Sequence, residues 1–262
     1  MRNTNIDNKS NDKSNFKKLT LGIAAAIVVG TIAFGAACGV SKSESNSATA
    51  PNKAVVTEKP AAIAPPKTTS VETAKTNATP PQALVDAGEF AENVYDFAKL
   101  KDWTKAGAKL SSLEKSLGEL KAANLAAPPL VETTNSLATA VKAKNEIDAM
   151  REANQATFLV AEQSAKFNLK VPVEIVKLDY YGREIEILAM TKDDAKLKMT
   201  AQAIRQTWNA VKPKIEAKGA TKVAAKFESL VAQTEKAASI ADYAKVATPI
   251  LDEVDNLEKV FE

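Results

Sequence analysis

From Pro81 to the last residue, apolar side chains recur every three or four positions, which is the period of an α-helix. The clearest apolar stripe consists of Trp103, Ala106, Leu110, Leu113, Leu117 and Leu120. Residues 240–261 repeat this spacing. Alternating strand patterns are nearly absent, and residues 81–262 contain only five glycines. The sequence therefore predicts an all-α fold for this region.

The helical region matches itself after a shift of about 91 residues. At that shift each copy opens after a proline, Pro81 and Pro172, and proline is favoured at the first turn of a helix. The apolar positions Phe90, Val94, Phe97 and Ala98 coincide with Tyr181, Ile185, Leu188 and Ala189. Chance agreement between helical periods is the alternative explanation. Because order and loop positions agree throughout, we interpret the pattern as an internal duplication.

The repeat predicts two tandem four-helix bundles, at residues 81–168 and 169–262. The helices expected in the first are 82–100, 102–122, 129–143 and 146–167. Those expected in the second are 173–190, 193–217, 220–237 and 240–260. Short connections favour antiparallel neighbours, so each bundle is expected to have up-down topology.

Several residues mark the expected helix ends. Asp102 is placed to cap a helix start, and Gly219 follows a helix end. Pro213 is expected to kink or end its helix. Residues 173–188 are rich in β-branched side chains and also fit a strand. The Asp179 and Arg183 pair, four residues apart, favours a helix there.

Residues 39–80 have a different composition from the helical region. They are rich in Ser, Thr, Asn, Pro, Lys and Ala, and they show neither a helical nor a strand period. Such a segment buries too little apolar surface to offset the loss of chain entropy, so we expect a disordered tether. A flexible chain of this length has a root-mean-square reach of about 35 Å.

The first 38 residues have the organisation of an export signal. A basic segment ending in Lys17 and Lys18 precedes an apolar run over residues 19–37, and Cys38 follows. Residues 34–38, Phe-Gly-Ala-Ala-Cys, resemble the lipobox of bacterial lipoproteins, although Gly35 stands where leucine is usual. The resemblance implies a cleaved signal peptide and a lipid anchor at Cys38, with fatty-acyl chains such as palmitate.

Two other interpretations of this segment are open. The apolar run is near the ~20 residues that span a bilayer, so an uncleaved anchor is one alternative. Ordinary cleavage after Ala37, giving a secreted protein, is the other. The lipoprotein, the uncleaved anchor and the secreted protein all place residues 39–262 on the extracytoplasmic side of the cell membrane.

The formal net charge of +3 does not describe the helical region. Residues 1–38 carry a net charge of +3 and residues 39–80 a net charge of +2, whereas residues 81–262 carry −2. The helical region therefore lacks the basic surface expected of a nucleic-acid-binding protein, and no nucleic acid is expected as a partner.

The composition excludes several kinds of catalytic and metal chemistry. The chain contains no histidine, and Cys38 is its only cysteine. The usual general base, zinc sites and dithiol chemistry are absent, so no enzyme activity, cofactor or metal site is predicted. Ser112 and Lys115 have the S-x-x-K spacing of penicillin-binding proteins and β-lactamases. Leu113 places them in mid-helix, and the partner motifs are missing.

Two groups of carboxylates offer oxygen ligands to a hard cation. Residues 191–194 also have the Thr-x-x-Asp form related to a capping box, and helix capping is the favoured interpretation. On the last helix, a solvated face is favoured over a weak calcium site. The acidic residues concerned are Asp252, Glu253, Asp255 and Glu258.

Aromatic residues supply the candidate contact surface. Trp208 lies on an apolar stripe and is expected in the core, whereas Trp103 lies near a loop and is expected to be half exposed. Adjacent residues on a helix point about 100° apart, so one of Tyr180 and Tyr181 should face outward. The predicted surface comprises Tyr180, Tyr181, Arg183, Glu184 and Trp103.

The sequence thus predicts a membrane-tethered lipoprotein acting as a non-enzymatic binding or adaptor module of the cell envelope. Its expected partners are the membrane, through the lipid anchor, and a protein or other envelope component. The expected site is the groove between the bundles or a bundle interior. The alternative is a solute- or metal-binding accessory lipoprotein of a transporter, with Asp, Glu and Tyr as ligands.

Overall fold

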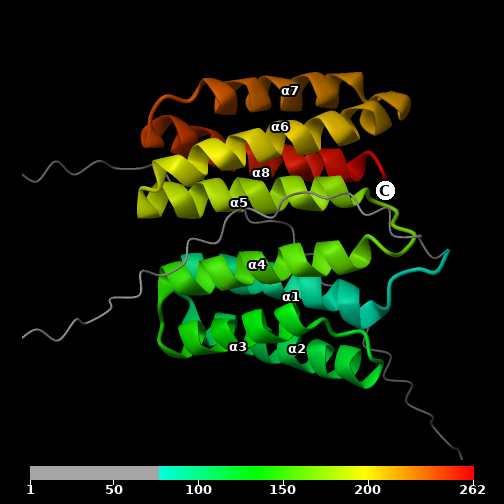
Figure 1. The fold of residues 1–262 in the computed structure, drawn as a ribbon, viewed down its shortest axis with the longest axis vertical. Coiled ribbons are helices and arrows are strands. Elements are labelled where there is room, and N and C mark those ends of the chain that lie inside the picture. Colours follow the sequence, from blue (N-terminus) through cyan, green and yellow to red (C-terminus); the bar gives the residue numbers. More distant parts are fainter. Residues whose placement is uncertain (1–76) are drawn as a thin grey trace, which may run out of the picture. The chain divides into compact units, whose positions relative to one another are not determined.

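The computed structural model describes residues 77–262, and within this range it contains eight α-helices and no strand (Figure 1). The all-α prediction is confirmed for this part of the chain. The predictions of an export signal, of a lipid anchor at Cys38 and of a tether concern residues that, up to residue 76, lie outside the described range. The helices are α1 (Gln82–Lys99), α2 (Trp103–Ala122), α3 (Pro128–Lys142), α4 (Glu146–Ser164), α5 (Val173–Thr191), α6 (Asp194–Ala217), α7 (Thr221–Lys236) and α8 (Ile240–Lys259).

The helix ends lie within three residues of their predicted positions. Residues 173–191 form a helix, as the Asp179 and Arg183 spacing indicated. Pro213 does not end its helix, because α6 continues to Ala217. Val211 and Ile215, on either side of this proline, are both fully buried, so core packing outweighs the lost backbone hydrogen bond.

Aspartates begin two helices in the same way. Asp102 accepts a 3.1 Å hydrogen bond from the backbone nitrogen of Lys105, and Asp193 accepts one of equal length from Lys196. The expected cap at Asp102 is confirmed. The capping interpretation of residues 191–194 needs correction, because Asp193 is the cap. Thr191 instead ends α5 and donates its hydroxyl to the carbonyl of Ile187.

Five helices end in the same backbone conformation. The C-cap of α5, and the residue after the C-cap in the other four, has a positive φ. Backbone N–H groups return to carbonyls of the last turn, as in a Schellman motif. The five residues are Lys101, Asn124, Lys144, Lys192 and Gly219. Gly219 confirms the predicted end of α6. The other four positions place a side chain where glycine is usually preferred.

Helices α1 to α4 enclose one hydrophobic cluster, in which α1 packs closely on α4. Small residues allow this approach: Ala87 and Ala91 on α1 are buried, as is Ala153 on α4. A Cβ atom added at Gly88 would lie 3.3 Å from the Val160 side chain, so larger residues would separate the two helices.

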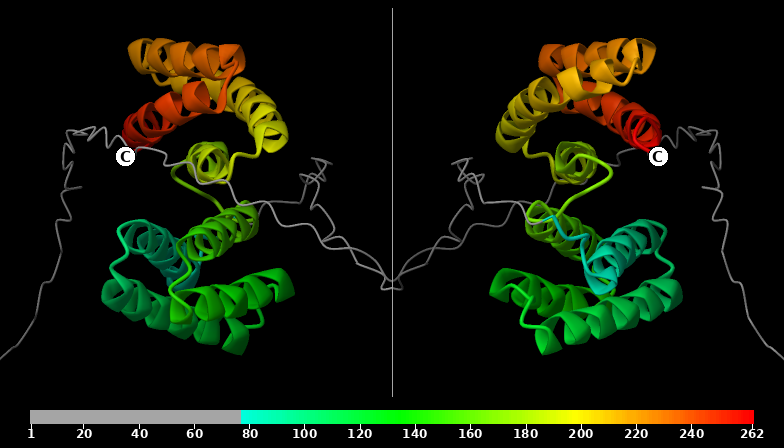
Figure 2. Two further views of the ribbon diagram at one scale, coloured as in Figure 1. Left: turned by 90° about the vertical axis from the view of Figure 1, so that its left-hand side faces the viewer. Right: turned by 90° about the vertical axis from the view of Figure 1, so that its right-hand side faces the viewer.

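Helices α5 to α8 enclose a second cluster. Trp208 is fully buried there, as predicted, with its ring centroid 4.8 Å from that of Phe227. Gly182 permits the close contact of α5 with α8, because an added Cβ would lie 2.7 Å from a methyl group of Leu251. Figure 2 shows the two sets of helices roughly along their axes.

Helix α5 also contacts α4 and contributes to the first cluster (Figure 1). Its residue Ile187 is fully buried among residues of α1 to α4, whereas Ile185 and Leu188 belong to the second cluster. Helix α5 is therefore apolar on two sides. This explains why its sequence lacks the single stripe of an ordinary amphipathic helix and also fits a strand.

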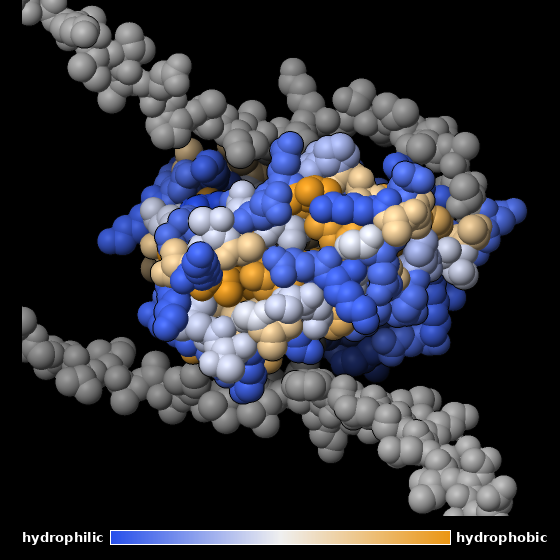
Figure 3. Space-filling view, turned by 90° about the horizontal axis from the view of Figure 1, so that it is seen from below, coloured by the Kyte–Doolittle hydropathy of each residue, from blue (hydrophilic) through white to orange (hydrophobic). Residues whose placement is uncertain are grey.

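The surface carries small apolar areas among charged side chains. Figure 3 shows one face, where apolar residues form separate patches flanked by hydrophilic ones. Among the described residues, the most exposed large apolar side chains come from helices and loops distant in sequence. They are Val85, Leu100, Leu125, Met190 and Met199.

Candidate functional site

The structure brings four of the predicted contact residues together on α5 and separates the fifth. Tyr180, Tyr181, Arg183 and Glu184 lie in the middle of α5, beside α4 and α1. Trp103 is the first residue of α2 and packs, partly buried, against the first cluster. The contact-surface hypothesis therefore concerns α5 and its neighbours.

Three aromatic rings are in contact across α4 and α5. The ring centroid of Tyr180 lies 4.7 Å from that of Phe158 on α4 and 5.2 Å from that of Tyr181. All three side chains are partly buried, so neither tyrosine is wholly inside or wholly outside. Lys177, whose ammonium lies 5.7 Å from the Phe158 ring centroid, also forms an ion pair with Glu162 at the edge of this group.

Arg183 is buried and binds carboxylates from two helices. Its Nη2 lies 2.9 Å from an oxygen of Asp179 on α5 and 3.6 Å from an oxygen of Glu92 on α1. The first of these contacts confirms the expected pair. The guanidinium carbon lies 5.3 Å from the Tyr95 ring centroid, which adds a cation–π contact. Nη1 is buried and has no hydrogen-bond partner.

Tyr95 and Glu186 extend this polar contact along the same helices. The Tyr95 hydroxyl donates a 2.7 Å hydrogen bond to Glu186, and the Lys99 ammonium lies 2.5 Å from the other oxygen of that carboxylate. We refer to Glu92, Tyr95, Asp179, Arg183 and Glu186 as the junction cluster.

Sequence reasoning missed Glu92, Tyr95 and Glu186. The 91-residue shift of the apolar pattern offered a signal for them, because it aligns Glu92 with Arg183 and Tyr95 with Glu186. In the structure these aligned residues contact each other.

Asn154 links α4 to α5 beside the junction cluster. Its side chain is fully buried. The amide nitrogen donates a hydrogen bond of 3.2 Å to the backbone carbonyl of Tyr180 and one of 3.4 Å to the carboxylate of Glu184. Its own oxygen is buried without a hydrogen-bond partner. Two polar atoms without partners, this oxygen and Nη1 of Arg183, thus lie on adjoining parts of one interface.

The surroundings shift the pKa values of the ionisable groups. Burial, with help from neighbouring carboxylates, raises the pKa of Glu92 to about 7, although Arg183 opposes the shift. Burial also raises the pKa of Glu184 and, together with the Glu186 charge, that of Tyr95. Burial opposes the charge on Arg183, but Asp179 and Glu92 more than offset it, so the Arg183 pKa is raised. The cluster therefore holds one permanent cation near a carboxyl group, that of Glu92, whose pKa is raised.

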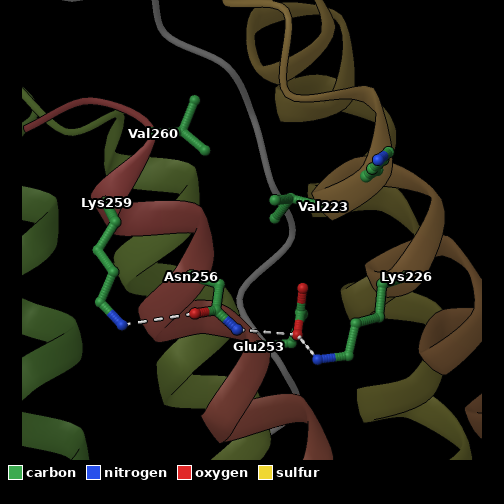
Figure 4. A pocket seen from close by; sticks show the side chains of 7 residues that line it. Val223, Lys226, Glu253, Asn256, Lys259 and Val260 are labelled. Carbon is green, nitrogen blue, oxygen red and sulfur yellow. Dashed lines mark hydrogen bonds and ion pairs between the residues drawn. The ribbon is translucent and has the colours of Figure 1, made fainter.

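A second polar site lies in a groove of about 490 Å³ between α7 and α8 (Figure 4). Three lysines, two valines, a glutamate and an asparagine line it: Lys222, Val223, Lys226, Glu253, Asn256, Lys259 and Val260. Glu253 corrects the prediction of a solvated acidic face, because it is only 2% exposed. It turns inward to pair with Lys226 and to accept a 3.0 Å hydrogen bond from Asn256.

The described residues contain no group of three or more acidic residues arranged to hold a metal ion. Within the same range, no helix is long and apolar enough to cross a bilayer. Ser112 lies within α2 and donates its hydroxyl to the carbonyl of Ala108 one turn earlier.

Comparison with protein-family models, with curated proteins and with solved structures finds no match.

Proposed function

We propose that this protein is a membrane-tethered lipoprotein whose helical region is a non-enzymatic binding or adaptor module of the cell envelope. The lipobox-like residues before Cys38 support the anchor, and the Ser/Thr/Pro/Lys-rich composition of residues 39–80 supports a spacer. The helical region would then face the extracytoplasmic side and reach its partner from the membrane surface.

We also propose that the helical region is a duplicated four-helix bundle. The support lies in a five-residue segment, Lys-Asp-x-x-Lys, found at 101–105 and again at 192–196. In both copies the first lysine has a positive φ, and the aspartate caps the next helix. The aspartate also pairs with the second lysine, at 2.8 Å and 3.2 Å respectively. If the two halves had separate origins, nothing would require the positive φ, the cap and the ion pair to recur 91 residues later.

The observation that best supports partner binding is the aromatic group formed by Phe158, Tyr180 and Tyr181. Partly exposed aromatic side chains contribute much of the energy at protein interfaces. Here the rings contact one another and are fixed on two packed helices, so little side-chain entropy remains to be lost on binding. Lys177 and Glu162 provide charges at the edge for orientation.

Site-specific photocrosslinking tests this surface. A photoreactive phenylalanine analogue replaces Tyr181 in the full-length, membrane-anchored protein, and a matched protein carries it at the exposed Ser136 on α3. The proposal predicts one discrete adduct from position 181, identified by mass spectrometry, and none of that mass from position 136. Equal labelling from both positions would contradict a contact surface on α5.

A Cys38→Ser variant tests the anchor separately. Lipidation predicts that the wild-type N-terminal peptide carries acyl chains, and that the variant remains unprocessed. An uncleaved anchor predicts an unmodified Cys38 peptide and identical masses for both proteins apart from the substitution. Secretion predicts that both chains leave the membrane fraction after cleavage at Ala37.

A further inference from the structure

We propose that the groove between α7 and α8 binds the phosphate group of a phosphate ester. The groove lies on other helices than the aromatic group, so the two proposals fail independently.

Glu253 forms the floor of the groove and fixes two donors. Its Oε2 pairs with the ammonium of Lys226 and accepts from the amide of Asn256. The Lys226 side chain remains 66% exposed, and an ammonium has three donors. The ion pair with Glu253 therefore fixes the position of the Lys226 ammonium and leaves N–H donors for a ligand.

Two more lysines make the groove cationic. Lys222 lies in the first turn of α7, where the helix dipole adds positive potential. Lys259, also on α8, donates a 3.4 Å hydrogen bond to the side-chain oxygen of Asn256, on the side of Asn256 away from Lys226 (Figure 4). Three lysines against Glu253 leave a net charge of about +2 in the lining, which disfavours cationic ligands.

The geometry favours a phosphate ester over a simple carboxylate. A phosphate presents several acceptor oxygens, so it can accept hydrogen bonds from more than one ammonium group. Val223 on α7 and Val260 at the end of α8 supply apolar surface for the organic part of the ester (Figure 4).

The proposed duplication supplies an internal comparison. At shifts of 93 and 94, Lys226 aligns with Thr133 and Glu253 aligns with Leu159, which packs against the first cluster. The second half therefore carries a buried carboxylate where the first half has an apolar residue. Burying a carboxylate is less favourable than apolar packing at the same place, so a ligand-binding role accounts for Glu253 better than folding does.

Lysine footprinting of the full-length protein in phosphatidylcholine nanodiscs tests the site. The acetylation rates of Lys226 and Lys259 are followed by mass spectrometry, with the exposed Lys115 on α2 as the internal reference. Glycerol 1-phosphate is expected to protect Lys226 and Lys259 at least fivefold and to leave Lys115 unchanged. Phosphatidylglycerol added to the nanodiscs tests a lipid headgroup as the source. Protection by either source supports the site, and protection by neither overturns it.

A Glu253→Leu variant separates a built site from general charge attraction. The change raises the lining charge to about +3 but releases Lys226 and Asn256 from their positions. The proposal predicts that the variant needs about ten times the glycerol 1-phosphate concentration of the wild type to reach half of the maximal protection of Lys259. General attraction predicts tighter binding instead, which would overturn the proposal. Leucine is the residue aligned at position 159, so the variant is expected to fold, and its thermal unfolding curve checks this.

A Lys226→Ala variant, with Lys115→Ala as the matched control, completes the test. The first is expected to weaken protection of Lys259 about tenfold and the second to leave it unchanged. An equal effect of both substitutions would mean that only net charge matters, and it would reject the site.

Discussion

The hydroxyl of Tyr95 donates a 2.7 Å hydrogen bond to the carboxylate of Glu186, a residue 91 positions later in the chain. The contact joins α1 to α5, and Tyr95 is only 1% exposed. A Tyr95→Phe substitution removes the donor and is expected to lower the free energy of unfolding by about 1–2 kcal/mol, because the acceptor is charged. Urea unfolding measures the change. Tyr243→Phe, in the buried part of α8, is the control and should cost less.

The raised pKa of Glu92 predicts a loss of stability on the alkaline side. Because the folded state holds its proton more tightly, stability falls as pH rises from the ordinary value of 4.5 through about 7. The facing charges are Arg183, which opposes the shift, and Asp179, Glu258 and Asp96, which add to it. The Glu92 side chain is 39% exposed, so solvent limits the effect to about 1 kcal/mol.

A Glu92→Gln variant, neutral at every pH, should lack this fall. Unfolding free energies at pH 5 and pH 8 are compared with those of the wild type. The variant is expected to be the more stable protein at pH 8. If its profile ran parallel to that of the wild type, Glu92 would not be the titrating group.

Glu228 predicts the opposite dependence. It accepts hydrogen bonds from Lys212, Arg205 and Trp208, which lower its pKa to about 2. The stability that the ionised Glu228 gives to the folded state is complete above pH 4.5 and is lost as pH falls toward 2. Glu228→Gln should therefore cost about 1 kcal/mol at pH 7 and almost nothing near pH 2. Thermal unfolding at the two pH values measures it, and an equal cost at both would contradict the assignment.

The left-handed conformation of Lys144 predicts a stabilising substitution. Its φ is 54°, at the end of α3, where a side chain strains the backbone by about 1 kcal/mol. Lys144→Gly relieves the strain and should raise the free energy of unfolding by up to about 1 kcal/mol. Lys142→Gly, at the last residue of α3, is the control and should lower it, because glycine is a poor helix former. Thermal unfolding separates the two directions.

Helix positions followed from the sequence because they depend on local signals. The apolar period, the prolines at helix starts and the cap at Asp102 act within a few residues. Pro213 was harder to predict, because the burial of Val211 and Ile215 depends on the neighbouring helices.

The polar contacts followed from the sequence only in part. Arg183 and Asp179 were predictable as a pair on one helix, but the burial of Arg183 depends on Glu92 and Tyr95 from α1. Glu253 was predicted to face solvent because its acidic neighbours suggested an exposed face. Its partner Lys226 comes from another helix, and pairing across helices leaves no periodic signal in the sequence.

The burial of Ile187 in the first cluster has a consequence for how the protein unfolds. A chain cut between α4 and α5 would leave residues 81–168 with a hole where Ile187 packs, and with the polar groups of Tyr95 and Asn154 facing water without their partners. The two sets of helices should therefore lose structure in a single transition, and each should be less stable when expressed alone. Helix α5 thus makes the stability of each half depend on the presence of the other.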